Sequence, residues 1–257
     1  MKKTLISHFY NEEYLLPWFL RHHQQVFDHG IMINYGSTDR SVEIIREICP
    51  TWDIIESRNK WFDPGPVDQE VMDIERSIDG WRICLNVTEQ LIGDYSILDN
   101  ATEDQFLIPT LVFVDRELND ELTYDQPLYM QRQDGFAYWD QEGKCFYERQ
   151  ARSMHRQAIQ YPGMGRHFTN YSTEKLAVFY YGWCPLNETA VGRKLGIGDK
   201  IPDWVVAGRH HTFGLEWIND RYENVFLPWT RSLSDDMQRY IEDHNRYITH
   251  HANSCAN

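Results

Sequence analysis

The chain has 257 residues and a mass of 30.7 kDa, enough for one sizeable α/β domain or two small ones. Its formal net charge of -14 argues against a nucleic-acid backbone or an anionic membrane as the main partner. The longest apolar run, Leu107 to Val114, contains a proline and is far too short to span a membrane.

Up to residue 90, short apolar runs alternate with amphipathic stretches. The runs typical of buried strands cover 4–9, 30–34, 52–55 and 81–87. Stripes of apolar residues at helical spacing predict helices within 11–26, 37–48 and 68–78. This alternation predicts an α/β fold with a mostly parallel central sheet flanked by helices and joined by right-handed crossovers.

The pattern is less regular beyond residue 100. Apolar runs at 107–114, 128–133 and 176–181 predict further strands, partly antiparallel, and Ser234 is expected to cap a last helix. No linker, low-complexity stretch or internal repeat divides the chain, so we expect a single domain over residues 1–257.

Polar side chains gather where the expected parallel strands end. These clusters lie at 8–13, 34–39, 57–68 and 86–90. Because open α/β sheets bind ligands outside the carboxyl ends of their strands, we expect a binding site at this edge.

Two of these clusters carry linked motifs, HFYNEEYLLPW at 8–18 and NYGSTDRS at 34–41. Together they resemble the opening of GT-A glycosyltransferases of family 2, and the stretch after residue 14 is similar to a subgroup related to family 92. The resemblance covers roughly residues 4–90 and the rest only in outline. It implies a GT-A domain that moves a sugar from a nucleotide-sugar donor to a carbohydrate or other hydroxyl acceptor, with inversion. Residues 1–115 would bind the donor, and 116–257 would form the acceptor side.

The resemblance also implies which residues contact the donor. The implied residues are Asn11, Glu12, Asn34, Asp39, Asp68, Asn86 and Thr88. Asn34 and Tyr35 stand where the family has two acidic residues, so the base that would be recognised stays open. Asp39 fits a turn and N-cap role equally well, and Asp68 fits a favourable charge at a helix N-terminus.

A divalent metal is implied at the end of the fourth strand, where the family has Asp-x-Asp for Mn²⁺ or Mg²⁺. Here residues 86–89 read Asn-Val-Thr-Glu, a degenerate form with one carboxylate. The implied metal ligands are Glu89 and, late in the chain, His210 or His211. A metal-independent mechanism stays open, because basic side chains can also neutralise the departing diphosphate. Basic clusters occur at 166–167, 193–194, 200 and 209–211.

Inversion requires a general base near the acceptor hydroxyl. Glu188 and Asp203 are best placed by their order in the chain, after the strand that ends near 183. Each also has a structural interpretation, Glu188 as the start of a helix. The tryptophans that could stack on a sugar ring are Trp183, Trp204, Trp217 and Trp229.

Two other functions compete with glycosyl transfer. The loss of acidic residues at 34 and 86 favours a catalytically silent nucleotide- or glycan-binding module. A nucleotidyltransferase is less favoured, because the chain has no glycine-rich phosphate loop. The absence of a signal peptide and of any CxxC pair among five cysteines predicts a cytoplasmic location. The oligomeric state is not indicated.

Overall fold

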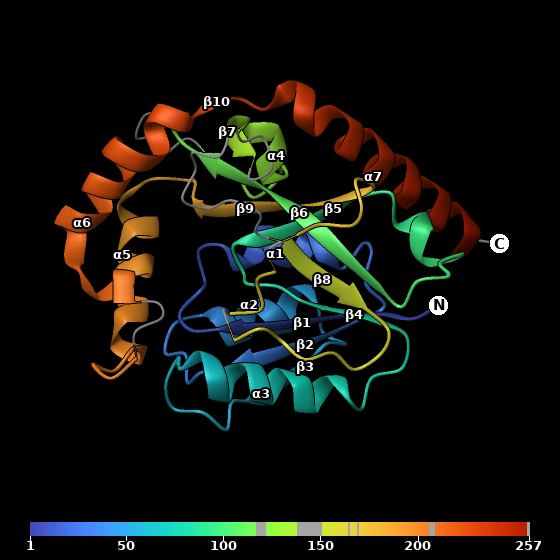
Figure 1. The fold of residues 1–257 in the computed structure, drawn as a ribbon, viewed down its shortest axis with the longest axis horizontal. Helices are drawn as coiled ribbons and strands as arrows, with labels where there is room; N and C mark the ends of the chain where they lie inside the picture. The colour runs from blue at the N-terminus through green and yellow to red at the C-terminus, as the bar shows by residue number, and fades with distance from the viewer. Residues whose placement is uncertain (117–121, 138–150, 164, 169, 206–208, 256–257) are drawn as a thin grey trace.

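The structure is a computed structural model that describes the chain except residues 117–121, 138–150, 164, 169, 206–208 and 256–257 (Figure 1). Its described strands form one ten-stranded sheet with parallel and antiparallel parts. Among the described residues, no helix is both long and apolar enough to cross a membrane.

The N-terminal part is a parallel sheet with strand order β4-β1-β2-β3. The elements are β1 (Lys3–Phe9), α1 (Leu16–His23), β2 (His29–Asn34), α2 (Ser41–Ile48), β3 (Asp53–Glu56), α3 (Pro64–Glu75) and β4 (Trp81–Cys84). The alternation of strand and helix that the sequence predicted is confirmed, and so is the α/β fold class.

Helices cover both faces of this parallel sheet, because successive side chains on a strand point to opposite sides. Leu5 of β1 packs in a cluster with residues of α1 and α2. Its neighbour Ile6 packs in a second cluster, with Val67 and Val71 of α3. Strands buried on both faces read as continuous apolar runs, which explains why the sequence signal was clear here.

The C-terminal part adds mainly antiparallel strands and more helices. These elements are β5 (Glu89–Gly93), η1 (Tyr95–Leu98), β6 (Gln105–Val114), α4 (Leu128–Gln131), β7 (Asp134–Ala137), β8 (Ala151–His155), β9 (Leu176–Trp183), α5 (Glu188–Gly196), η2 (Ile197–Lys200), η3 (Arg209–Thr212), α6 (Gly214–Arg221), η4 (Tyr222–Phe226), η5 (Leu227–Trp229), β10 (Arg231–Ser232) and α7 (Ser234–Cys255). Strand β8 pairs with both β4 and β6, and β6 pairs in turn with β7 and β9. The parallel and antiparallel parts therefore share one continuous sheet.

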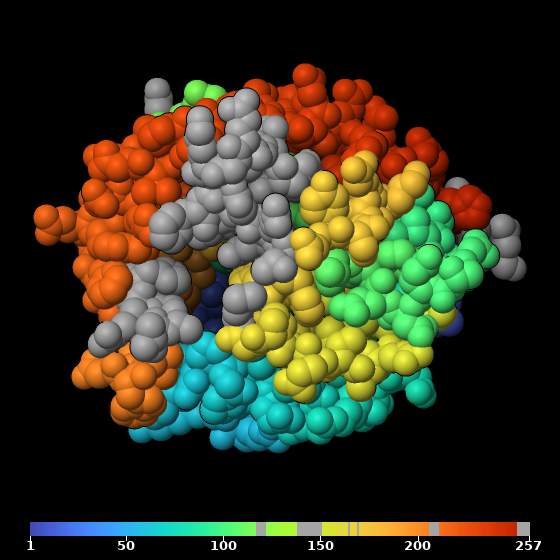
Figure 2. Space-filling view, in the orientation of Figure 1, coloured from blue at the N-terminus to red at the C-terminus, as the bar shows by residue number. Residues whose placement is uncertain are grey.

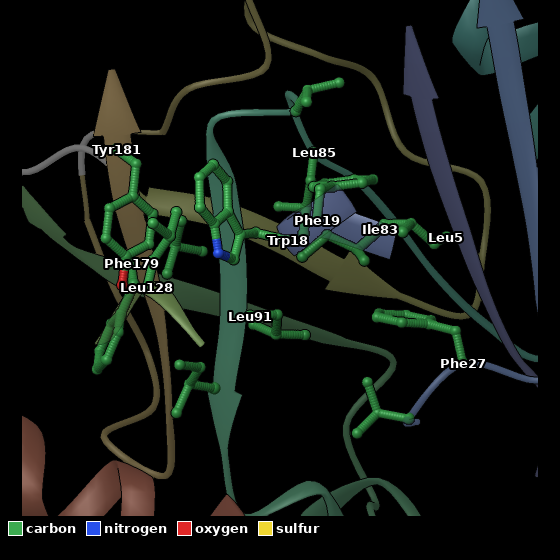
Figure 3. Close-up of a cluster of buried hydrophobic side chains, with 14 of the residues drawn as sticks. Leu5, Trp18, Phe19, Phe27, Ile83, Leu85, Leu91, Leu128, Phe179 and Tyr181 are labelled. Atoms are coloured by element: carbon green, nitrogen blue, oxygen red, sulfur yellow. The ribbon is translucent and has the colours of Figure 1, made fainter. Parts of the chain in front are cut away.

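The main core lies between the sheet and the helices α1 and α7. Figure 3 shows Trp18 and Phe19 of α1 in the same cluster as Leu91 of β5 and Phe179 and Tyr181 of β9. These side chains are almost fully excluded from solvent. Residues far apart in the sequence thus bury a common apolar surface, which is the dominant stabilising term of a domain.

Three sequence predictions of elements need correction. The run 128–133, predicted as a strand, begins with the short helix α4 after Pro127. Strand β4 ends at Cys84, so Asn86 follows the strand. Helix α3 begins four residues earlier than expected, because the Asp63 side chain caps it and a proline is well tolerated in a first helical turn.

Candidate active site

The described structure has a cavity of about 370 Å³ at the carboxyl ends of β1 and β4. Its lining residues are His8, Phe9, Tyr10, Glu12, Phe62, Pro64, Val67, Asp68, Asn86, Val87, Thr88, Gly165, Arg166, His167, Tyr180, Gly182, Arg193, Lys194, Ile197, Ile201 and His211. Figure 1 shows α5 beyond the end to which the β2 arrow points. In Figure 2 dark-blue atoms of the N-terminal segment lie at the bottom of a hollow between cyan and orange segments.

Arg166 occupies the wall formed by the strand ends and α3. Its Nη1 donates to Asp68 Oδ1 at 2.8 Å, and Nη2 lies 3.4 Å from the His8 ring nitrogens and from Asn86 Oδ1. Arg166 has a φ of 66°, in the left-handed region that costs free energy for a residue with a Cβ. The surroundings therefore hold this guanidinium in place against local backbone strain.

A second cationic group comes from α5. Arg193 Nη1 donates to Glu12 Oε1 at 2.6 Å, and both side chains are buried. The neighbouring Lys194 is buried too, with Nζ 3.3 Å from the Gly182 carbonyl oxygen and 4.0 Å from the centre of the Trp183 ring. Burial, then repulsion by Arg193, lowers the pKa of Lys194 to about 7.

Three histidines also line the cavity. Burial is the main cause that holds the pKa of His8 and of His167 well below the usual value, and nearby arginines act in the same direction. His211 Nδ1 lies 2.9 Å from the carbonyl oxygen of Lys194. Because a carbonyl only accepts hydrogen bonds, Nδ1 carries the hydrogen, which leaves Nε2 as the basic nitrogen of the neutral ring.

The cavity contains four of the residues that the sequence assigned to the donor, Glu12, Asp68, Asn86 and Thr88, and one assigned to the metal, His211. The strand-end position was the useful signal for Glu12, Asn86 and Thr88, whereas Asp68 lies in α3. Sequence reasoning did not single out His8 or Tyr180, although His8 precedes the Asn-Glu-Glu motif on the same strand.

Asn11, Asn34 and Asp39 are not in the lining, because their side chains hold the loops after β1 and β2. Asn11 Oδ1 accepts from Thr38 N at 2.8 Å, and Asn34 Oδ1 accepts from Ser37 N at 2.9 Å. Asp39 accepts from the backbone of Ser41 and of Glu13. For Asn34 and Asp39, in the second motif, these contacts are those of turn and cap residues.

Glu89 lies behind the cavity, in a buried ion pair. Its Oε1 accepts from Arg152 Nη2 at 2.5 Å and Nε at 3.0 Å, and its Oε2 accepts from Asn86 N at 2.8 Å. Protein donors therefore satisfy both carboxylate oxygens. The structure assigns this side chain to an ion pair that fixes the start of β5, in place of the expected metal ligand.

The two residues expected to act as bases lie elsewhere. Glu188 is exposed in the first turn of α5, which Asn187 caps through a bond to Ala190 N, and Asp203 is exposed after η2. Neither lines the cavity. The side chain of His210, an expected metal ligand, lies outside the described residues.

The residues present do not fit a divalent metal. Throughout the described part of the chain, no group of three or more His, Cys, Asp or Glu side chains is placed to hold a metal ion. The two carboxylates in the cavity, Glu12 and Asp68, are each bonded to an arginine. Hard cations such as Mg²⁺ need several oxygen ligands, and adjacent guanidinium groups would repel them.

No protein-family model and no curated protein matches the chain. Among solved structures it is similar to TarS 1-349 of S. aureus, at 13% identity over 96% of this chain and 82% of that one, with a TM-score of 0.42. It is also similar to glucosyl-3-phosphoglycerate synthase from Mycobacterium tuberculosis in complex with Mn²⁺, UDP and glucosyl-3-phosphoglycerate, at 14% identity over 43% and 44% of the chains and a TM-score of 0.30. A third similar structure is HddC from Yersinia pseudotuberculosis, at 12% identity over 70% of this chain and 77% of that one, with a TM-score of 0.31.

Proposed function

We propose that the protein is a glycosyltransferase that moves a sugar from a nucleotide-sugar to a carbohydrate or other hydroxyl acceptor, with inversion. The observation that carries this proposal is the cavity at the carboxyl ends of β1 and β4, which the buried side chains of Arg166, Arg193 and Lys194 line. Open α/β sheets bind ligands at this edge. A cationic, partly apolar cavity suits a diphosphate attached to a base and a sugar.

The chemistry requires two kinds of group. As the acceptor oxygen bonds to the anomeric carbon, the bond from that carbon to the diphosphate breaks, and its electron pair leaves on the phosphate oxygen. Cationic side chains stabilise this developing charge, most strongly where water is excluded. The acceptor proton must pass to a base, and we assign this role to His211, whose basic nitrogen is Nε2.

The acceptor side of the proposal rests on two tryptophans next in sequence to the cavity lining or close to it. Trp204 is 69% exposed and packs edge-on against Trp61, with ring centres 6.3 Å apart. The two tryptophans lie close in sequence to Phe62 and Ile201, which line the cavity. Exposed indole rings stack well on the apolar face of a sugar, which favours a carbohydrate acceptor.

The test is to incubate the protein with a panel of nucleotide-sugars and hydroxyl acceptors and to measure the release of nucleoside diphosphate and the formation of product. We expect turnover with one donor, lowered about 10²- to 10⁴-fold in kcat by His211→Asn. The asparagine amide keeps a donor for the Lys194 carbonyl. No release from any donor, with or without Mn²⁺, would overturn the proposal.

A catalytically silent binding module is the second candidate. It is favoured by one observation: both carboxylates that line the cavity are engaged in ion pairs with arginines. This alternative predicts that a nucleotide-sugar binds in the calorimeter and is neither hydrolysed nor transferred. Measurable transfer that His211→Asn lowers would exclude it.

A further inference from the structure

The carboxylates near the cavity are already committed to arginines. Asp68 is bonded to Arg166, and Glu12 is bonded to Arg193. Burial raises the pKa of both carboxyls, and the arginine partners oppose that change. Glu12 and Asp68 each keep one buried oxygen without a hydrogen-bond partner among the described residues, but a divalent cation bound there would lie beside a guanidinium that repels it. These arginine-paired carboxylates therefore disfavour a divalent metal. The charge of a diphosphate would then be neutralised by the cationic side chains Arg166, Arg193 and Lys194.

Some N–H groups of these cationic side chains have no acceptor among the described residues. The Nε atoms of Arg166 and Arg193 are buried and have no hydrogen-bond partner among the described residues. Lys194 has three N–H groups, and the Gly182 carbonyl takes one of them. Buried donors without acceptors are costly, and phosphate oxygens would satisfy them with charge-assisted bonds.

We propose that Arg166 and Lys194 bind the diphosphate of the donor directly and take the place of the divalent cation. This inference rests on the proposed function, because it names how that same site would hold its substrate. Arg166 stands among the strand ends and α3, whereas Lys194 comes from α5, so the two line the same cavity from different elements. A diphosphate bound between them would receive a positive charge from each.

We call the pair of Arg166 and Lys194 the clamp. It predicts that the protein takes up a proton when a diphosphate binds. Lys194 titrates near neutral pH because burial lowers its pKa to about 7, and no carboxylate of the described residues bonds to it. A diphosphate favours the charged amine and raises that pKa, so binding above neutral pH takes up one proton from the buffer. The other charged groups that face the amine are Arg193, which lowers its pKa, and Glu12, which raises it less.

The experiment is calorimetric titration with UDP, GDP, ADP and CDP, in chelator and then with Mn²⁺ or Mg²⁺. We expect one nucleotide to bind in chelator with an affinity that the metal does not improve. Above about pH 7 the affinity should fall by up to about tenfold per pH unit. Lys194→Met should weaken binding by at least about tenfold and remove this pH dependence. Lys194→Arg, whose charge is fixed, should retain binding and also lose the pH dependence.

Control variants distinguish a loss of diphosphate binding from a loss of folding. Lys175→Met removes an exposed lysine whose side chain lies outside the cavity lining, and it should bind like the wild type. Replacing Arg166 alone would leave Asp68 buried without its partner, so the matched variant is Arg166→Gln combined with Asp68→Asn. Melting temperatures of all variants establish that each one folds.

The outcomes are distinguishable. Binding that requires Mn²⁺ or Mg²⁺ would overturn the clamp and leave the proposed function standing. Binding in chelator that Lys194→Met leaves unchanged would also overturn it. If none of the four nucleotides binds under any condition, the proposed function itself fails.

Discussion

Protein donors bond to both carboxylate oxygens of Glu89. Arg152 donates to Oε1, and the backbone N–H of Asn86 donates to Oε2. Glu89→Ala would leave Arg152 buried without a counter-charge, so we expect the free energy of unfolding to fall by about 3–5 kcal/mol in urea titrations. The double variant Glu89→Met with Arg152→Met should recover much of that loss, because it buries no charge. If Glu89→Ala instead kept full stability and abolished a Mn²⁺-dependent activity, Glu89 would be a metal ligand.

Because of Lys194, we expect the free energy of unfolding to change with pH above neutrality. Its pKa is about 7 in the folded protein against 10.5 for the ordinary side chain, so between these values the unfolded chain binds more protons. The free energy of unfolding should therefore rise with pH in this window, by about 1.4 kcal/mol per pH unit for this one group. Urea titrations of the wild type and Lys194→Met, compared from about pH 7 to about pH 10, measure the difference. Parallel curves would contradict a buried, titrating Lys194.

Trp204 offers a test of the acceptor side. We expect Trp204→Ala to raise the KM for a carbohydrate acceptor about three- to tenfold, which corresponds to the loss of about 0.5–1.5 kcal/mol of stacking. The Kd of the donor should not change, because the ring lies outside the cavity lining. Trp229→Ala removes another exposed indole that does not line the cavity and serves as the matched control. Equal effects of the two substitutions would contradict the assignment.

At the residue scale, the sequence predicted which edge of the sheet holds a cavity better than it predicted the contacts of the side chains. The strand-end rule pointed to Glu12, Asn86 and Thr88, which line one cavity, because it depends only on the direction of parallel strands. It could not tell that Asn11 and Asn34 bond to backbone N–H groups of the adjoining turns. Amide side chains suit ligands and turns equally, and only their neighbours in space decide between the two roles.

Helices α1 and α7 meet through a cluster of buried histidines. The rings of His22 and His244 are stacked with centres 4.7 Å apart, and His23 Nε2 accepts from Leu91 N at 3.2 Å. Neither ring nitrogen of His244 has a hydrogen-bond partner among the described residues. Burial lowers the pKa of His22 to about 4 and that of His244 to about 2. The folded protein therefore keeps these rings neutral at acidic pH, where the unfolded chain binds protons.

This contact between helices should be sensitive to acid. Stability should be fully present above about pH 6.5 and should fall below it, by about 1.4 kcal/mol per pH unit for each ring. His244→Phe keeps an aromatic ring and removes one titrating group, so its stability should fall less steeply from about pH 6.5 to about pH 5. Urea titrations at several pH values measure the two slopes. If the slopes are equal, protons do not act at this contact.

At the element scale, predictability followed the burial of the strands. The strands of the parallel sheet read as apolar runs separated by helices of regular length, and their existence was predicted correctly. Strand β5 was missed, because Glu89 and Gln90 are polar although they are buried. Their burial depends on the ion pair with Arg152 and on pairing with β9, both distant in the sequence. Local patterns carry no information on such contacts.

The whole molecule is expected to unfold as one unit, which the sequence anticipated from the lack of a linker. Strand β6 supports this expectation, because it pairs with β7, β8 and β9 while β8 pairs with β4 of the parallel sheet. The cavity also takes residues from both halves of the chain, for example His8 and Arg166. Separation of the halves would break the sheet and the site together.

Circular dichroism and tryptophan fluorescence should therefore report the same urea transition. Phe113 of β6 is fully buried, and its ring lies 4.6 Å from that of Tyr181 and 5.1 Å from that of Phe179. Phe113→Ala should lower the free energy of unfolding by about 3–5 kcal/mol and shift both signals equally, because the lost packing belongs to the shared core. If the substitution shifted one signal and left the other at its wild-type midpoint, the parallel and antiparallel parts would unfold independently, and the chain would contain two domains.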